Sequence, residues 1–148
     1  MYYYLARNST LEVNGKFAIG YDSVVQVFPG GRLTLNSGSV NAGAVFAVKN
    51  HSTIGKDFLG GRHFVFEDSD FHQIIDLENN QIINASNKGI TIKDRVWVGE
   101  GVTILKDVTV GNHSVLGAKS VVTRDIPDHC VAVGSPAKVI KTNIDWKA

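Results

Sequence analysis

The stretch Ile90–Val122, ITIKDRVWVGEGVTILKDVTVGNHSVLGAKSVV, decides the fold, because its apolar residues recur at intervals of six. Every sixth residue of a main series is aliphatic: Ile92, Val98, Ile104, Val110, Leu116 and Val122. A companion series, two residues earlier, is β-branched or small: Ile90, Val96, Val102, Val108, Ser114 and Ser120. Glycine directly follows the main series three times, at Gly99, Gly111 and Gly117.

A period of six matches neither an amphipathic helix nor a half-buried strand that alternates strictly. It matches a short strand followed by a turn, with one large side chain pointing inward on each side of a coil. Three such sides close a triangular coil of about 18 residues, and coils stack at about the 4.8 Å spacing of paired strands. The small companions suit tight inward space at a corner, and the glycines relieve crowding there or supply a positive φ. The sequence therefore predicts an all-β fold.

The same spacing recurs less cleanly in two earlier blocks, Val13, Ile19, Val25 and then Val48, Ile54, Gly60, Phe66, His72. The blocks are out of phase, so we expect coils over about 11–72 and 90–126, interrupted by a polar, asparagine-rich loop at 73–89. A short C-terminal segment, 127–148, completes a single domain. A generic β-sandwich is the alternative, but its strands are rarely spaced so strictly.

The composition narrows the functional classes. The 148 residues suffice for one domain with a core, and a net charge of +1 argues against a dedicated nucleic-acid binder. A single cysteine forms no internal disulfide, which favours a reducing compartment. No apolar run approaches the roughly 20 residues of a membrane span, and MYYYLARNST lacks the pattern of a signal peptide. We therefore expect a cytoplasmic protein without a membrane span.

Four motifs together resemble the hexapeptide-repeat acyltransferases: VWVGEGVTIL (96–105), VAVGSPAKVIK (131–141), DSDFH (68–72) and IIN (82–84). The chain is most similar to the sugar and polysaccharide O-acetyltransferases, which include maltose and galactoside types and capsule or O-antigen relatives. This resemblance implies a left-handed parallel β-helix built from hexapeptide repeats. It also implies a homotrimer that binds acetyl-CoA between neighbouring coils at each subunit interface.

The resemblance places the catalytic histidine at His72, where the inward series would otherwise require an aliphatic residue. A histidine suits removal of a hydroxyl proton because its pKa lies near the working pH. An ordinary loop histidine is the alternative. Asp70 could orient the imidazole and fix its tautomer, as a third group does at other sites, or it could cap the loop. Asp68 is expected to be a turn residue.

Two asparagines are candidates for substrate binding. Asn41, in SVNAG, matches an asparagine of the relatives that places acceptor and base, although asparagine ladders inside β-helix corners are a structural alternative. Asn84 lies on the loop expected to cover the site, and a local turn is its alternative role.

The remaining candidates concern acetyl-CoA. Trp97 should point outward, because Val96 and Val98 take the inward positions, and the matching tryptophan of the relatives lies near the pantetheine and the catalytic histidine. Backbone amides near Gly117 and Ala118 could bond the pantetheine arm, and Pro136 and Ala137 belong to a turn near the adenine. The basic residues expected to meet the phosphates are Arg124, Lys138 and Lys141, with Lys119 a weaker candidate.

Two other chemistries are disfavoured. The histidines at 51, 63 and 72 lack the spacing of a γ-type carbonic anhydrase, so we expect no metal. Cys130 lies far along the chain from His72 and is interpreted as a small packing residue. His113 and His129 are interpreted as surface residues.

The sequence thus indicates an acetyl-CoA-dependent O-acetyltransferase acting on a sugar hydroxyl in cell-surface polysaccharide assembly. Two alternatives stay open: transfer to the nitrogen of an amino sugar, and a non-catalytic β-helix module that binds a partner.

Overall fold

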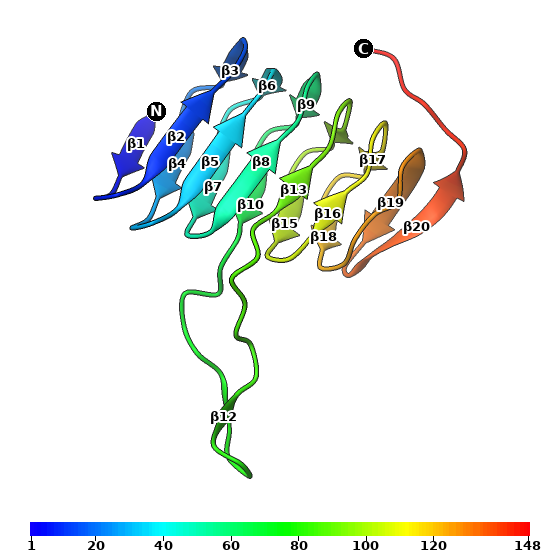
Figure 1. Cartoon of the computed structure of the whole chain (residues 1–148). Coiled ribbons are helices and arrows are strands. Elements are labelled where there is room, and N and C mark those ends of the chain that lie inside the picture. Colours follow the sequence, from blue (N-terminus) through cyan, green and yellow to red (C-terminus); the bar gives the residue numbers. More distant parts are fainter.

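The computed structural model describes the whole chain, residues 1–148, and contains twenty strands and no helix. The strands wind into about six stacked coils, each of which passes through three parallel sheets (Figure 1). The winding is that of a left-handed parallel β-helix, which confirms the predicted fold. No element is present that could cross a membrane as a long apolar helix.

Every coil visits the three sheets in the same order. Sheet 1 contains β1 (Tyr2–Leu5), β4 (Val24–Val27), β7 (Val45–Val48), β10 (Val65–Glu67), β15 (Thr103–Leu105) and β18 (Val121–Val122). Sheet 2 contains β2 (Thr10–Val13), β5 (Arg32–Leu35), β8 (His51–Ile54), β13 (Thr91–Ile92) and β16 (Thr109–Val110). Sheet 3 contains β3 (Phe17–Ile19), β6 (Gly38–Val40), β9 (Phe58–Gly60), β14 (Trp97–Val98), β17 (Val115–Leu116), β19 (Cys130–Gly134) and the antiparallel β20 (Ala137–Thr142). We name each corner by the sheets that it joins, as the 1–2, 2–3 or 3–1 corner.

The hexapeptide series forms the core. All six aliphatic residues of the main series are buried, and so are all six companions. The two buried serines of the companion series are satisfied, since Ser114 donates to the carbonyl of Pro127 at 2.7 Å and Ser120 to that of Gly117 at 2.6 Å. In the third and fourth coils four phenylalanines fill the interior: Phe46, Phe58, Phe64 and Phe66. The inward side chains thus account for the stacking that the period of six predicts.

The sequence suggested two roles for glycine at the corners, relief of crowding and supply of a positive φ, and the structure assigns these roles to different residues. Gly99 has no positive φ, but a Cβ there would lie 2.7 Å from the main-chain nitrogen of Ala118 on the next coil. Close approach of stacked corners therefore explains this glycine. Positive φ is adopted two residues later in the same corner by Gly101, with φ of 67°, and at the 2–3 corners by Arg95, His113 and His129, with φ of 52°, 60° and 56°. These L-residues are held in a conformation that is uncommon outside glycine.

The first coil begins earlier than the predicted start near residue 11. The strand Tyr2–Leu5 pairs in register with Val24–Val27 in sheet 1. All four of its residues are exposed, so no alternation of burial marked it in the sequence.

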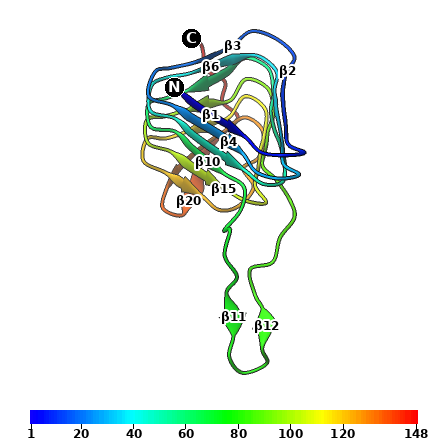
Figure 2. The ribbon, with the colours of Figure 1, turned by 90° about the vertical axis from the view of Figure 1, so that its left-hand side faces the viewer.

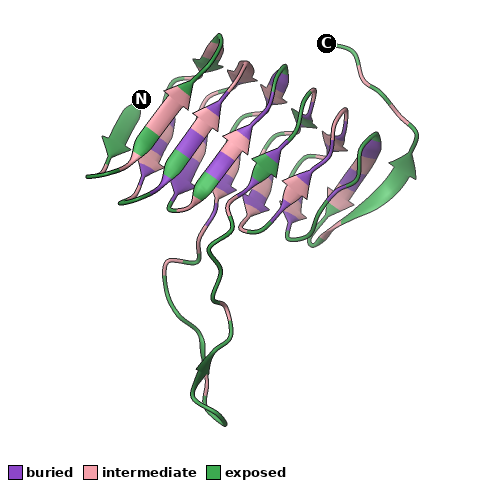
Figure 3. Ribbon diagram, in the orientation of Figure 1, coloured by how far each residue is buried: buried purple, intermediate pink, exposed green.

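The loop also begins earlier than predicted. The chain leaves the solenoid after Glu67 and rejoins it at Thr91. Within this excursion β11 (Ile75–Asp76) and β12 (Gln81–Ile82) pair as an antiparallel hairpin that projects from the coils (Figures 1 and 2). The hairpin is exposed, while burial is concentrated in the solenoid (Figure 3). The interpretation of His72 as an inward residue of the repeat is therefore wrong, because His72 lies on the excursion and is exposed.

The outward faces of the three sheets differ in character. Register pairing aligns a row on sheet 1 that is apolar except for Thr103: Val24, Val45, Val65, Thr103 and Val121. It aligns a second apolar row on sheet 3: Leu59, Trp97, Val115 and Val131. Sheet 2 instead carries a threonine row: Thr34, Thr53, Thr91 and Thr109. Only sheet 2 thus presents a regular hydroxyl-bearing surface to solvent.

Candidate active site

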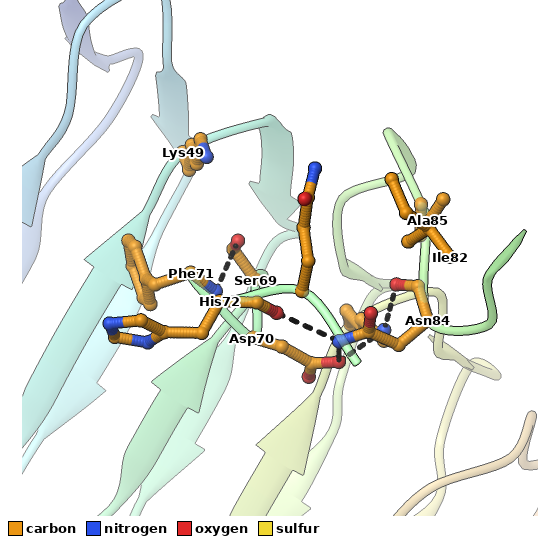
Figure 4. A pocket seen from close by; sticks show the side chains of 11 residues that line it. Lys49, Ser69, Asp70, Phe71, His72, Ile82, Asn84 and Ala85 are labelled. Carbon is orange, nitrogen blue, oxygen red and sulfur yellow. Dashed lines mark hydrogen bonds and ion pairs between the residues drawn. The ribbon is translucent and has the colours of Figure 1, made fainter. Parts of the chain in front are cut away.

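A cavity of about 220 Å³ lies where the excursion leaves the 1–2 corner of the fourth coil. Figure 4 shows the side chains that surround it. The lining residues are Lys49, Ser69, Asp70, Phe71, His72, Gln73, Ile82, Asn84, Ala85, Ser86 and Lys106. Of the candidates from the sequence, the structure brings His72, Asp70 and Asn84 together here.

Asp68 anchors the root of the excursion. Its side chain is fully buried, and its carboxylate accepts hydrogen bonds from the main-chain nitrogen of Lys49 at 2.7 Å and from the hydroxyl of Ser52 at 2.6 Å. The main-chain nitrogen of Asn50 donates to both carboxylate oxygens, at 3.1 and 3.2 Å. Ser52 in turn accepts from the nitrogen of Ile90, where the chain returns. Asp68 was expected to be a turn residue. It is instead a buried residue whose hydrogen bonds join the two ends of the excursion to β8 and to the residues just before it.

Asp70, Asn84 and Lys106 form a network across the cavity (Figure 4). The Asp70 carboxylate accepts from Lys106 Nζ at 2.6 Å and from Asn84 Nδ2 at 2.7 Å. Lys106 also donates to the carbonyl of Asn84 at 2.8 Å. The Lys106 ammonium, followed by the Asn84 amide, lowers the pKa of the Asp70 carboxyl below its ordinary value. Asp70 is thus held ionised and tied to both the loop and the fifth coil.

The expected contact between Asp70 and the imidazole of His72 is not made. The carboxylate is turned toward Asn84 and Lys106, whereas the imidazole points to the other side (Figure 4). Asp70 instead fixes the main chain, because its carbonyl accepts from the nitrogen of His72 at 2.6 Å. Asn84 holds the other side of the same residue by donating to the His72 carbonyl at 2.9 Å. The network therefore positions the backbone of His72 and leaves its ring free.

Phe71 explains why the ring of His72 is turned outward. Phe71 has a φ of 58°, which is unusual for a bulky residue, and its main-chain nitrogen donates to the hydroxyl of Ser69 at 3.0 Å. Its ring packs on Phe28 of the second coil, with centroids 4.7 Å apart. This packing fixes the turn, so the side chain that follows is directed to solvent beside the cavity.

Lys106 was missed by the sequence reasoning. The sequence did contain a signal for it. Lys88, Lys106 and Arg124 are spaced by one coil length of eighteen residues, which places Lys106 at the 1–2 corner, next to the point where the loop leaves the coils. Its role depends on contacts with residues 22 and 36 positions away, which no local motif reveals.

The candidates for the donor side lie elsewhere on the solenoid. Trp97 points outward from β14 and is 43% exposed between the buried Val96 and Val98, as predicted. Gly117 and Ala118 form the 3–1 corner of the fifth coil, and the Ala118 N–H has no acceptor within the chain.

The basic candidates are exposed. Lys138 and Lys141 lie on β20, and Arg124 lies at the 1–2 corner of the sixth coil. None of the three forms an ion pair within the chain. Lys119, the weaker candidate, pairs with Glu100 at 3.6 Å.

The other candidates fall outside the cavity. Asn41 follows β6 at a 3–1 corner and does not line it. Cys130 is buried in the core, which confirms its packing role. No group of three His, Cys, Asp or Glu side chains is arranged to hold a metal ion. A single chain therefore has two separate sets of candidates, one around the cavity and one on sheet 3.

Comparisons with known proteins agree with this architecture. A family model described as bacterial transferase hexapeptide (six repeats) matches residues 89–124. The polysialic acid O-acetyltransferase of Escherichia coli O1:K1 / APEC is 42% identical over 121 residues, which are 82% of this chain and 38% of that protein. The chain thus spans less than two fifths of the length of this curated relative.

Two solved structures extend the similarity over nearly the whole chain. The crystal structure of the polySia-specific acetyltransferase NeuO superposes with a TM-score of 0.78 at 35% identity, covering 97% of this chain and 70% of that one. The polysialic acid O-acetyltransferase OatWY superposes with a TM-score of 0.66 at 25% identity, covering 100% and 92%. With the buried hexapeptide core and the coil count, these matches show that the chain belongs to the hexapeptide-repeat transferase family, in the branch of the sugar and polysaccharide O-acetyltransferases.

Proposed function

We propose that the protein is an acetyl-CoA-dependent O-acetyltransferase that modifies a sugar hydroxyl in cell-surface polysaccharide biosynthesis. The observation that carries the proposal is the exposed imidazole of His72 at the mouth of a cavity whose walls are tied together by Asp70, Asn84 and Lys106. The similarity to acetyltransferases of polysialic acid supports a carbohydrate acceptor.

In this proposal His72 is the general base. Acetyl-CoA supplies the acetyl group as a thioester. The neutral imidazole takes the proton of the sugar hydroxyl while the hydroxyl oxygen forms a bond to the thioester carbonyl carbon. When the carbon–sulfur bond breaks, the imidazolium returns that proton to the departing thiolate. The backbone bonds that Asp70 and Asn84 make to His72 fix the main chain from which the imidazole projects, which limits where the base can meet the acceptor.

The donor side fits the chemistry of coenzyme A. The exposed indole of Trp97 offers an apolar wall, and the free N–H of Ala118 offers a donor to an amide of the pantetheine arm. Lys138, Lys141 and Arg124 offer unpaired cations to the phosphates.

These two sets of residues meet only if a neighbouring copy contributes one of them. We propose a homotrimer in which the apolar row of sheet 1 in one copy packs against the apolar row of sheet 3 in the next. The threonine row of sheet 2 then remains outside. Rows of valine and leucine on two faces of a small solenoid are the kind of surface that proteins bury between subunits.

The test is acetyl transfer by His72→Ala, measured with a panel of sugar acceptors. We expect a loss of at least 10²-fold in kcat, the range typical for a general base. His51→Ala is the matched control, because His51 is an exposed histidine on sheet 2 outside the cavity. Turnover near that of the wild type in a folded His72→Ala protein would refute the mechanism.

Product analysis and calorimetry separate the alternatives. An acetyl ester that hydroxylamine cleaves supports O-acetylation, whereas a resistant amide identifies an amino-sugar acceptor. Absence of heat on titration with acetyl-CoA would favour a module that binds a partner without catalysis.

A further inference from the structure

The C-terminal tail, residues 143–148, returns along the 2–3 corners of the last three coils (Figure 1). At the sixth coil the nitrogen of Ile144 donates to the carbonyl of His129, and His129 Nδ1 bonds the carbonyl of Ile144, both at 3.0 Å. At the fifth coil Asp145 lies 3.1 Å from His113 Nδ1. Successive residues of the tail thus contact the corners of successive coils.

At the fourth coil the tail ends its descent with Trp146. Arg95 donates to the carbonyl of Trp146 at 2.9 Å, and the indole Nε1 of Trp146 donates to the carbonyl of Arg95 at 2.7 Å. The Arg95 guanidinium also lies over the indole, 5.3 Å from its centroid. Terminal residues are usually poorly ordered unless they are tied down, and Trp146 is held by three contacts, one through its main-chain carbonyl and two through its indole.

The position of Trp146 matters more than its attachment. Its ring lies beside Trp97, with centroids 6.2 Å apart and planes at 49°. These are the only two tryptophans of the chain, and the structure places both at one point on the surface of sheet 3. Trp97 remains 43% exposed, so Trp146 widens the aromatic surface without covering it.

The two tryptophans lie at the same coil as the base of the proposed acetyl transfer, His72. Trp97 belongs to the fourth coil, the same coil from which the excursion carrying His72 leaves. In a trimer whose axis runs along the coils, corresponding coils lie level, so the indole pair of one copy is level with His72 of another. The basic residues of β20 lie three strand positions beyond β14 in sheet 3, and the free amide of Ala118, after β17, lies between.

We infer that Trp146 is a second donor-site residue, which with Trp97 forms the wall for the thioester end of the pantetheine arm. This inference rests on the proposed function. The chain of Arg95, His113 and His129 contacts positions the tail, so the donor site includes a segment that the repeat itself does not encode. An indole pair at this place excludes water from the thioester and limits the directions that the arm can take.

The experiment measures acetyl-CoA affinity by calorimetry for the wild type, Trp146→Ala and the control His51→Ala. We expect Trp146→Ala to raise the Kd for acetyl-CoA about tenfold and the KM for acetyl-CoA in parallel, with the KM for the sugar unchanged. An unchanged Kd in a folded Trp146→Ala protein would overturn the inference while leaving the proposed function intact. A wild-type protein that binds no acetyl-CoA would overturn both.

Fluorescence gives a second measurement that does not depend on the stability of Trp146→Ala. In Trp97→Phe the sole remaining tryptophan is Trp146, and excitation at about 295 nm avoids the four tyrosines. Saturating acetyl-CoA should change its emission and shield it from acrylamide, whereas adenosine 3′-phosphate 5′-diphosphate, which lacks the pantetheine arm and the thioester, should shield it less. Equal quenching with and without acetyl-CoA, under conditions where calorimetry shows binding, would mean that Trp146 only fastens the tail.

Discussion

Replacement of Asp68 by asparagine tests whether the buried carboxylate fastens the excursion to the solenoid. The carboxylate receives hydrogen bonds from three donors: the nitrogens of Lys49 and Asn50 and the hydroxyl of Ser52. An asparagine has the same shape but only one acceptor oxygen, and its NH₂ must face at least one of these donors. The oxygen of Ser52 is already engaged by Ile90, which restricts its rotation.

The expected cost follows from those contacts. A hydrogen bond to a charged group contributes about 1.5–3 kcal/mol, and a buried donor left without a partner costs about 1–3 kcal/mol. Partial rearrangement of the Ser52 hydroxyl recovers some of this, so we expect Asp68→Asn to lower the free energy of unfolding by about 2–4 kcal/mol. For a chain of this size that corresponds to a decrease in Tm of about 4–16 °C.

The assay is thermal unfolding followed by circular dichroism, with hydrogen exchange to locate the change. The matched control is Asp57→Asn, the same substitution at an exposed corner where the side chain makes no hydrogen bond, and we expect a change within about 0.5 kcal/mol. Exchange should increase in 68–90 before the rest of the solenoid. If Asp68→Asn melts within 2 °C of the control (about 0.5–1 kcal/mol), the reasoning from buried hydrogen bonds is refuted.

Three further outcomes are expected. Lys106→Met removes the main cause of the lowered pKa of Asp70, together with the bond to the Asn84 carbonyl. In urea titrations its destabilisation should be largest at pH 7 and should shrink as the pH falls through about 3.9 and then through the lowered pKa, because Asp70 is then protonated in both proteins. Gly111→Ala should cost about 1–3 kcal/mol in chemical denaturation, because its Cβ would overlap the main chain of the next coil; an unchanged midpoint would refute this. Mixed oligomers of inactive His72→Ala and Trp97→Ala chains should regain activity at about a quarter of their sites, and no recovery on co-refolding would refute sites shared between subunits.

The repeat could be predicted because burial follows a fixed spacing. Every aliphatic residue between Ile92 and Val122 that the period selects is in the core. The same rule failed where burial is polar, since Asp68 is as buried as Phe66 but is held by hydrogen bonds rather than by apolar contact. Counting aliphatic positions therefore placed the end of the predicted coil too late, at His72 rather than at Glu67.

The sequence predicted several residues of the candidate site but not the contacts between them. The motif around His72 and Asn84 selected two residues that do share a cavity. The partner of Asp70 could not be assigned, because Lys106 arrives from the next coil and its contact is set by the path of the loop. The tail gave no signal at all, since Trp146 lies beyond the repeat and its position depends on one arginine 51 residues away.

The left-handed corners have a consequence for evolution and for engineering. Arg95, His113 and His129 occupy backbone positions that glycine would fill with less strain, yet their side chains are the ones that hold the tail. Substitution by glycine at these corners should relax the coil locally while releasing the tail. Stability of the solenoid and completeness of the proposed donor site are therefore in opposition at these three positions. A search for more thermostable variants that judged stability alone would select against the surface on which Trp146 rests.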